Sequence, residues 1–276
     1  YSMPIYCMAA LTPAMNNTPA PVTIMPKVTT VSGARLSSAA VTISGISTTT
    51  TISVSGSSGT PRFKVNGGAE VSSSSAVANG DSIVFRMDAP TTAETKNTMT
   101  INFGGRSQTW WVGYTDSAKV GHVFVSSATY TGALGGLSGA DIKCNNLASA
   151  AGLPGTWTAY LSTSTVDAID RIPIWNQLKR IDGTVVSSTW DDMWYGSLSN
   201  PPNRNEYGVQ RDAGVWTGSD MYGKSYSNGG TFADTWTTNS GSGVTYGNSS
   251  RISGGWSNEG VAYSHYNESL YCFSTY

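Results

Sequence analysis

Residues 136–152, GLSGADIKCNNLASAAG, decide the fold of the second half of the chain. Their small and apolar members recur at helical spacing and line one stripe, which consists of Ala140, Cys144, Leu147, Ala148 and Ala151. We expect a helix with one buried face. Ser138 is the expected N-cap, Asp141 the acidic residue of the first turn, and Gly152 the left-handed residue that ends the helix.

A second cysteine near the end of the sequence offers a partner for this helix. Cys272 lies in SLYCFSTY, residues 269–276, where alternate positions suggest a half-buried strand. We predict a disulfide between Cys144 and Cys272. In the chain-entropy model, closing a loop of this length stabilises the fold by roughly 5 kcal/mol. The alternative is two unrelated buried thiols.

The composition indicates a mainly β protein with a small α+β part. Only 12% of the 276 residues are charged, against about 25% in typical soluble domains. Ser, Thr, Gly and Asn take their place, in short alternating runs separated by Gly-rich turns. The sequence changes near residue 115 from short alternating segments to an aromatic-rich region, which argues for two domains.

Charge and hydropathy exclude two classes of partner. The formal net charge is −1 and basic residues do not cluster, so we expect no binding to nucleic acid. No apolar run approaches the roughly 20 residues that span a bilayer, so we expect no membrane insertion. The sequence starts with Tyr1 rather than Met, from which we expect removal of a leader, and a disulfide favours an extracellular location.

Residues 1–26 form an uncharged arm that contains five prolines and many apolar residues. The arm is too apolar for a solvated linker and too rich in proline for a long helix. It either packs against its own neighbouring domain or docks on another subunit. In the second case Ile5, Tyr6 and the unpaired Cys7 are the expected intermolecular contacts, and the chain would associate with itself.

Residues 27–115 alternate in short segments that predict an antiparallel β-sandwich of six or seven strands. The turns between them contain VNGG at 65–68, NGD at 79–81 and FGG at 103–105. These motifs resemble the Ig-like modules strung along bacterial surface and secreted proteins. The resemblance covers about two thirds of the domain and implies a spacer or stalk.

Residues 116–276 are rich in aromatic side chains, with seven of nine tryptophans and eleven of fourteen tyrosines beyond residue 121. We expect strands at 122–126, 156–161 and 184–186, and a second helix at 165–172. A long irregular region, 187–264, follows. Loops of such length are usually functional.

Four ordered motifs carry a resemblance over this domain: residues 123–172, IDGTVVSS at 181–188, VWTGSDMYG at 215–223 and LYCF at 270–273. They are similar to a bacterial extracellular family of unassigned activity with a C-type-lectin-like, endostatin-like fold. The resemblance implies the same bridge between the first helix and the last strand. A second cystine common in that family is missing, because its positions fall near Ala233 and His265. An Ig-like stalk before such a domain also resembles the layout of intimin-type adhesins.

The sequence offers no set of catalytic residues. His122 and His265 lack the spacing of zinc ligands, and no nucleophile is paired with a base, so we expect neither an enzyme nor a cofactor. Calcium is the alternative, because carboxylates gather in the irregular region. They are Asp191, Asp192, Glu206, Asp212, Asp220 and Glu259.

Rigid aromatic rings among short polar residues are typical of recognition loops. The candidate ligand-binding residues are Trp194, Tyr195, Tyr207, Tyr222, Tyr226 and Trp236. We expect Trp216 and Trp256 in the core instead. The sequence thus predicts an extracellular adhesion or ligand-binding protein, in which an Ig-like spacer presents a C-type-lectin-like head to a surface glycan or protein. The alternative is the structural subunit of an extracellular filament or surface layer, assembled through the arm.

Overall fold

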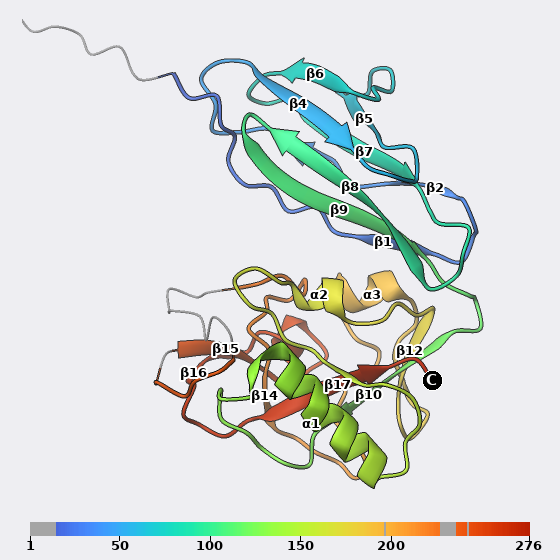
Figure 1. Ribbon diagram of the computed structural model, residues 1–276, viewed down its shortest axis with the longest axis vertical. Helices are drawn as coiled ribbons and strands as arrows, with labels where there is room; N and C mark the ends of the chain where they lie inside the picture. The colour runs from blue at the N-terminus through green and yellow to red at the C-terminus, as the bar shows by residue number, and fades with distance from the viewer. Residues whose placement is uncertain (1–14, 196, 227–235, 242) are drawn as a thin grey trace, which may run out of the picture. The chain divides into compact units, whose positions relative to one another are not determined.

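The computed structural model describes residues 15–195, 197–226, 236–241 and 243–276 (Figure 1). This part of the chain is mainly β, with three α-helices and strands in several sheets. It divides into two compact units. The first unit contains Arg35–Asp88, Asn97–Trp111 and the segment that ends at Pro26; the second contains Lys27–Ala34, Ala89–Lys96 and Val112–Tyr276.

Nine strands make up two sheets in the amino-terminal part of the chain. One sheet has the order β1-β9-β8-β4-β6, and the other has the order β2-β7-β3 with β5 also paired to β7. The strands are β1 (Lys27–Thr29), β2 (Arg35–Ser37), β3 (Val41–Thr42), β4 (Thr50–Ser55), β5 (Arg62–Val65), β6 (Ser74–Val77), β7 (Ser82–Asp88), β8 (Thr95–Phe103) and β9 (Arg106–Tyr114).

The predicted alternation places apolar side chains between these two sheets. Along β7, Ile83, Phe85 and Met87 are fully buried. The ring of Phe85 meets the ring of Phe63 on β5 at 6.4 Å between centroids and, edge to face, the ring of Phe103 on β8 at 5.9 Å. Phe103 belongs to the other sheet, so these rings join the two layers, as expected from period-two burial.

The described half of the arm, residues 15–26, lies against the first unit. The backbone N–H of Ala20 donates to the Ser44 carbonyl at 2.9 Å, and the indole N–H of Trp110 donates to the Met25 carbonyl at 2.8 Å. These contacts agree with an arm that packs on its own domain. Ile5, Tyr6 and Cys7 lie outside the described residues, so self-association through them stays a prediction.

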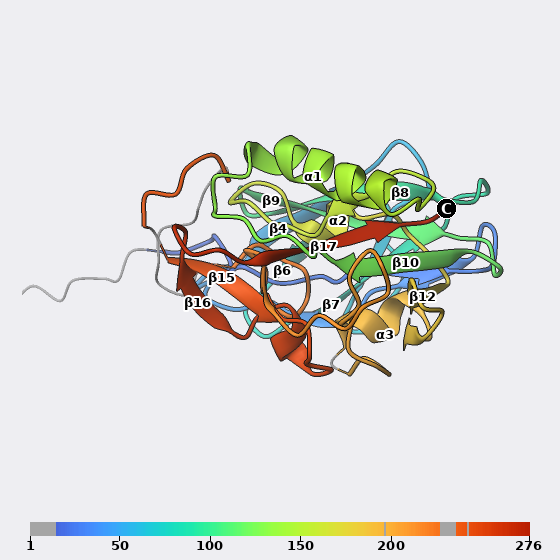
Figure 2. The same ribbon diagram turned by 90° about the horizontal axis from the view of Figure 1, so that it is seen from below.

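The second unit contains a sheet with the order β13-β12-β10-β17-β14-β15-β16, to which β11 adds through β17. The strands are β10 (Val120–Val125), β11 (Thr158–Ala159), β12 (Gln177–Arg180), β13 (Val185–Ser187), β14 (Gly214–Trp216), β15 (Gly243–Asn248), β16 (Gly260–Tyr263) and β17 (Ser269–Ser274). The helices are α1 (Gly136–Ala150), α2 (Ala168–Arg171) and α3 (Trp190–Trp194), with a short 3-10 turn, η1, at Gly254–Trp256. Helix α1 runs beside β17 (Figure 2). Among the described residues, no helix is both long enough and apolar enough to cross a bilayer.

Strand β17 is central, which corrects the expectation of a half-buried strand. It pairs antiparallel with β10 and β11 and parallel with β14, and all six of its residues are buried. Even the hydroxyl-bearing positions are inside. Ser274 donates from Oγ to the Thr156 carbonyl at 2.7 Å, which satisfies the buried hydroxyl.

Helix α1 ends as predicted but begins differently. Gly152 has φ +73°, and its N–H donates a hydrogen bond to the Ser149 carbonyl. The N–H of the next residue, Leu153, donates to the Ala148 carbonyl. This pattern is a Schellman motif. At the start, left-handed Gly135 takes the cap position without any side-chain hydrogen bond, and Ser138, the expected N-cap, lies inside the helix.

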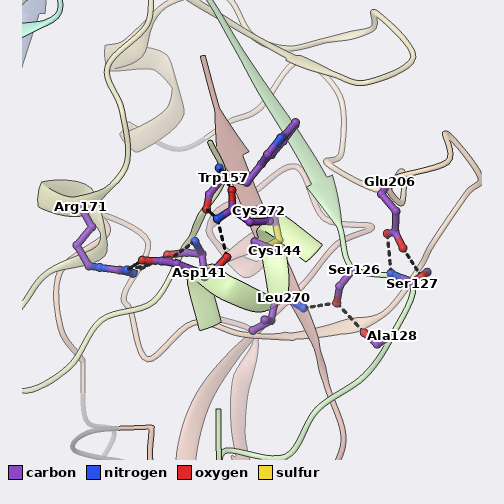
Figure 3. The surroundings of a disulfide bond; sticks show 12 residues. Ser126, Ser127, Ala128, Asp141, Cys144, Trp157, Arg171, Glu206, Leu270 and Cys272 are labelled. Atoms are coloured by element: carbon purple, nitrogen blue, oxygen red, sulfur yellow. Dashed lines mark hydrogen bonds and ion pairs between the residues drawn. A yellow bond between two sulfur atoms is a disulfide. The ribbon is translucent and has the colours of Figure 1, made fainter. Parts of the chain in front are cut away.

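The disulfide between Cys144 and Cys272 is confirmed (Figure 3). The two Cα atoms are 5.6 Å apart and both residues are fully buried. Next to the bridge, the amide of Asn145 holds the backbone of Trp157 from both sides, accepting from its N–H at 2.9 Å and donating to its carbonyl at 2.7 Å. Helix α1 is therefore joined to β17 by a covalent bond and to the segment before β11 by paired hydrogen bonds.

Candidate functional site

The second unit has a core made largely of aromatic rings. The ring of Trp194 lies 5.4 Å from that of Trp190 and 6.2 Å from that of Tyr160, and only 1% of Trp194 is exposed. Trp236 is equally buried and donates from its indole nitrogen to the Ser162 carbonyl at 2.8 Å. These two tryptophans, expected to contact a ligand, instead support the fold because their faces are covered by other side chains.

Trp216 and Trp256 are buried as expected, and Trp216 belongs to the apolar cluster around the disulfide. The expected strands and second helix are present as β10, β11, β13 and α2. Two of them are shorter than expected, because β11 covers two residues and α2 four.

The four tyrosines among the candidate residues reach solvent. Their exposed fractions are 51% for Tyr195, 59% for Tyr207, 36% for Tyr222 and 37% for Tyr226. Tyr195 directly follows α3. The backbone of Tyr226 is held by two hydrogen bonds: its N–H donates to the Gly218 carbonyl, and its carbonyl accepts from the Thr245 hydroxyl. Tyr207 and Tyr222 lie on tight turns of their own.

The Tyr207 turn, residues 205–209, is built around one buried amide. Oδ1 of Asn205 accepts from the backbone N–H groups of Tyr207 and Val209, both at 3.0 Å. The backbone N–H of Asn205 donates to the Val209 carbonyl at 2.9 Å. Gly208 has φ +78°, a left-handed value that residues with a side chain rarely adopt. Asn205 is 9% exposed, so the turn points its amide inward and Tyr207 outward.

The Tyr222 turn, residues 220–224, repeats this construction fifteen positions later. Oδ1 of Asp220 accepts from the N–H groups of Tyr222 and Lys224, both at 2.9 Å. The N–H of Asp220 bonds the Lys224 carbonyl at 2.8 Å, and Gly223 has φ +71°. The sequences NEYGV and DMYGK therefore form the same turn, with an Asn or Asp first, a Tyr third and a left-handed Gly fourth.

Each turn is attached to the body of the second unit by a buried or ion-paired group. In the Tyr207 turn, the carboxylate of Glu206 is 2% exposed and accepts from the N–H and hydroxyl of Ser127 (Figure 3). In the Tyr222 turn, Nζ of Lys224 lies 3.0 Å from Oδ2 of Asp167. Such anchors leave both tyrosines at fixed positions before any partner arrives.

The electrostatics of the two turns differ because only one carries a charge at its first position. Burial raises the pKa of the Asp220 carboxyl, and the nearby carboxylate of Asp167 raises it further. The N–H groups of Lys224 and Tyr222 act in the opposite direction, because they stabilise the ionised form. Asn205 performs the same structural task without titrating.

Most of the acidic residues considered for calcium accept hydrogen bonds or form ion pairs within the protein. Asp191 and Asp192 occupy the first turn of α3, Asp212 accepts from neighbouring side-chain amides, and Glu259 forms an ion pair with Arg251 at 2.6 Å. Across the residues that the structure describes, no three His, Cys, Asp or Glu side chains form a group that could hold a metal ion.

The two histidines occupy different environments. His122 on β10 is stacked on the ring of Tyr276 at 4.2 Å, and burial, followed by the charge of Lys179, lowers its pKa. His265 is exposed and contacts the rings of Tyr263 and Tyr266.

Sequence reasoning missed this second group of exposed rings. Tyr263 is 55% exposed and Tyr266 is 51% exposed. The available signal was the alternation in GVAY, where Val261 and Tyr263 share one face of β16.

No model of a known protein family matches the sequence. The second unit presents exposed aromatic rings on turns that are held by hydrogen bonds. Such rings are suited to contact with a partner.

Proposed function

We propose that this protein is an extracellular, non-enzymatic adhesion or ligand-binding protein. The first unit is an Ig-like β-sandwich that acts as a spacer, and the second is a C-type-lectin-like head that contacts a surface glycan or protein. The observation that carries the proposal is the pair of matching turns that hold Tyr207 and Tyr222 in solvent.

The matching turns support binding for an energetic reason. A tyrosine buries a large, amphipathic ring at the cost of only two side-chain torsions, so it loses little entropy on contact. Fixing the backbone beneath it lowers the cost of association further. Asn205, which is buried, and Asp220, which is half-buried, fix the two turns by accepting two backbone N–H groups each.

The fold proposal rests on two features. The joined sheets of β5, β7 and β8 suit a sandwich, with turns at the positions that the Ig-like resemblance implies. The disulfide between α1 and β17 suits the C-type-lectin-like resemblance, which implies a bridge between the first helix and the last strand.

The test is binding of the full chain to glycan and protein arrays, followed by Kd measurement for each hit. Tyr207→Ala and Tyr222→Ala should each weaken the hit at least tenfold, or about 1.4 kcal/mol. Ile142→Ala, which removes a 60% exposed side chain from α1, is the matched control and should leave Kd unchanged. The proposal is contradicted if neither tyrosine substitution weakens any of the hits.

A further inference from the structure

The turn that follows β16 carries three exposed rings in mutual contact. Residues 263–266 close a turn in which the N–H of Tyr266 donates to the Tyr263 carbonyl at 2.9 Å. Tyr263, His265 and Tyr266 are all exposed, whereas Ser264 is 1% exposed. We call these three rings the β16 triad.

Ser264 fixes the triad to two other segments of the second unit. Its carbonyl accepts from the N–H of Gly132 at 2.7 Å, and its hydroxyl accepts from the N–H of Gly241 at 3.0 Å. A buried serine with both groups bonded cannot rotate outward without losing them. The backbone of the turn is thus held, and the rings project from a fixed base.

Two of the rings are stacked and the third stands across them. The planes of Tyr263 and His265 differ by 7°, with centroids 5.7 Å apart. Tyr266 stands nearly perpendicular to both, at 83° to Tyr263 and 78° to His265. Val261, on the same face of β16 as Tyr263, is 43% exposed and extends the surface. Among the residues that the structure describes, strand β16 pairs with β15 alone and ends the order of its sheet.

From this geometry we infer that the β16 triad is a carbohydrate site, which stacks a pyranose ring of a neutral glycan. An aromatic face carries negative partial charge, and the C–H groups on one side of a pyranose carry positive partial charge, so the two surfaces attract and exclude water together. The hydroxyls of the sugar also need polar partners. His265 has two ring nitrogens, and Asn267, which is exposed and follows Tyr266 in the sequence, has a side-chain amide that can donate and accept.

A single sugar fits the triad better than a protein surface does. Specific protein interfaces use about 20–30 residues on each side, and the triad with Val261 provides four. One pyranose ring can be covered by two or three aromatic side chains.

This site goes beyond the proposed function, because none of its rings belongs to the Tyr207 turn or the Tyr222 turn. The β16 triad can lack carbohydrate binding while the two turns bind a partner, and the two turns can lack a partner while the triad binds carbohydrate. Variants of the two surfaces therefore separate the two tests.

The experiment is saturation-transfer NMR and titration of the full chain with four neutral hexasaccharides: cellohexaose, chitohexaose, maltohexaose and xylohexaose. We expect at least one to bind, with saturation strongest at its ring C–H protons. Tyr263→Ala and Tyr266→Ala should each raise Kd about tenfold or more, equal to about 1.4 kcal/mol. Tyr263→Phe keeps the aromatic face and should retain most of the affinity.

Two matched controls complete the design. Ile142→Ala, at a 60% exposed position of α1 that belongs to neither surface, should leave hexasaccharide binding unchanged, and near-ultraviolet circular dichroism of each variant should match the parent chain. The inference is overturned if none of the four hexasaccharides binds at millimolar concentration. It is also overturned if a Tyr263→Ala, Tyr266→Ala double variant that keeps its fold binds them as the parent does.

Discussion

Asn205 and Asp220 show how two different side chains perform one structural task. Each places a single oxygen under its turn to receive two backbone N–H groups. An amide oxygen and a carboxylate oxygen are equally able to accept, which explains the exchange. The difference is that the carboxylate at Asp220 also brings a charge into a half-buried position near Asp167.

Asp220→Asn should preserve the Tyr222 turn and change its dependence on pH. The pKa of Asp220 is raised in the folded protein, so its favourable contribution is full below the unfolded value and is lost as pH rises through the folded value. Asparagine does not titrate. We therefore expect Asp220→Asn to gain stability relative to the parent between about pH 4, near the usual aspartate pKa, and pH 7. The measurement is urea unfolding at several pH values.

Asp220→Ala is the contrasting variant, because it removes the acceptor as well as the charge. Two N–H groups lose their partner, at a cost of about 1–3 kcal/mol. A result in which Asp220→Asn and Asp220→Ala lose equal stability at pH 7 would show that the shared oxygen does not hold the turn.

At the scale of elements, helix α1 is held by polar groups as much as by its apolar stripe. Ala140, Cys144 and Ala148 are its buried residues. Beside them, the Asp141 carboxylate receives the guanidinium of Arg171 at 2.7 Å and the N–H of Ala159 at 2.8 Å. These bonds set the position of α1 against β11 and α2, where small side chains alone would let it slide.

Asn145→Ala tests this polar attachment. The substitution removes both hydrogen bonds to the Trp157 backbone and should lower the free energy of unfolding by about 1–3 kcal/mol. Asn146→Ala, at the adjacent exposed position, is the matched control and should change it by less than about 0.5 kcal/mol. Equal effects in thermal unfolding would mean that only helix propensity is being measured.

The elements that sequence predicted best are those with local signals. The stripe of α1, its left-handed Gly152 and the glycine turns near Asn66 and Gly104 depend on residues close in sequence. The burial of β17 on both faces depends on α1, which is bonded to Cys272, and on rings such as Trp175, which is stacked on Phe273. Both are distant in the chain, so alternation alone was misleading. Tertiary context also decides capping, because Gly135 and not Ser138 is the N-cap of α1.

The candidate site was predictable in part for the same reason. Aromatic composition marked the region but could not separate Trp194, whose ring is enclosed by other rings, from Tyr207, which a turn holds in solvent. A clearer signal was present in NEYGV and DMYGK, which share an Asn or Asp two positions before Tyr and a Gly directly after it. That spacing is the local rule that turns a side-chain oxygen toward the backbone.

At the scale of the whole chain, one covalent bond spans much of the second unit. Cys144 and Cys272 are separated by 128 positions, so the bridge limits the unfolded chain strongly. The double variant Cys144→Ala, Cys272→Ala should lose about 5 kcal/mol in the chain-entropy model, measured by guanidinium unfolding. Reduced parent protein should behave like the variant. A difference below about 1 kcal/mol would show that the aromatic core determines the stability without the bridge.

The central place of β17 also governs when this unit can fold. Strands β10, β11 and β14 precede it in the chain, and each of them pairs with it. A ribosome therefore releases all three before residues 269–274 emerge to join them. Until then the tryptophan-rich interior stays open to the surrounding solvent. The second unit can therefore be completed only after residues 269–274 have left the ribosome.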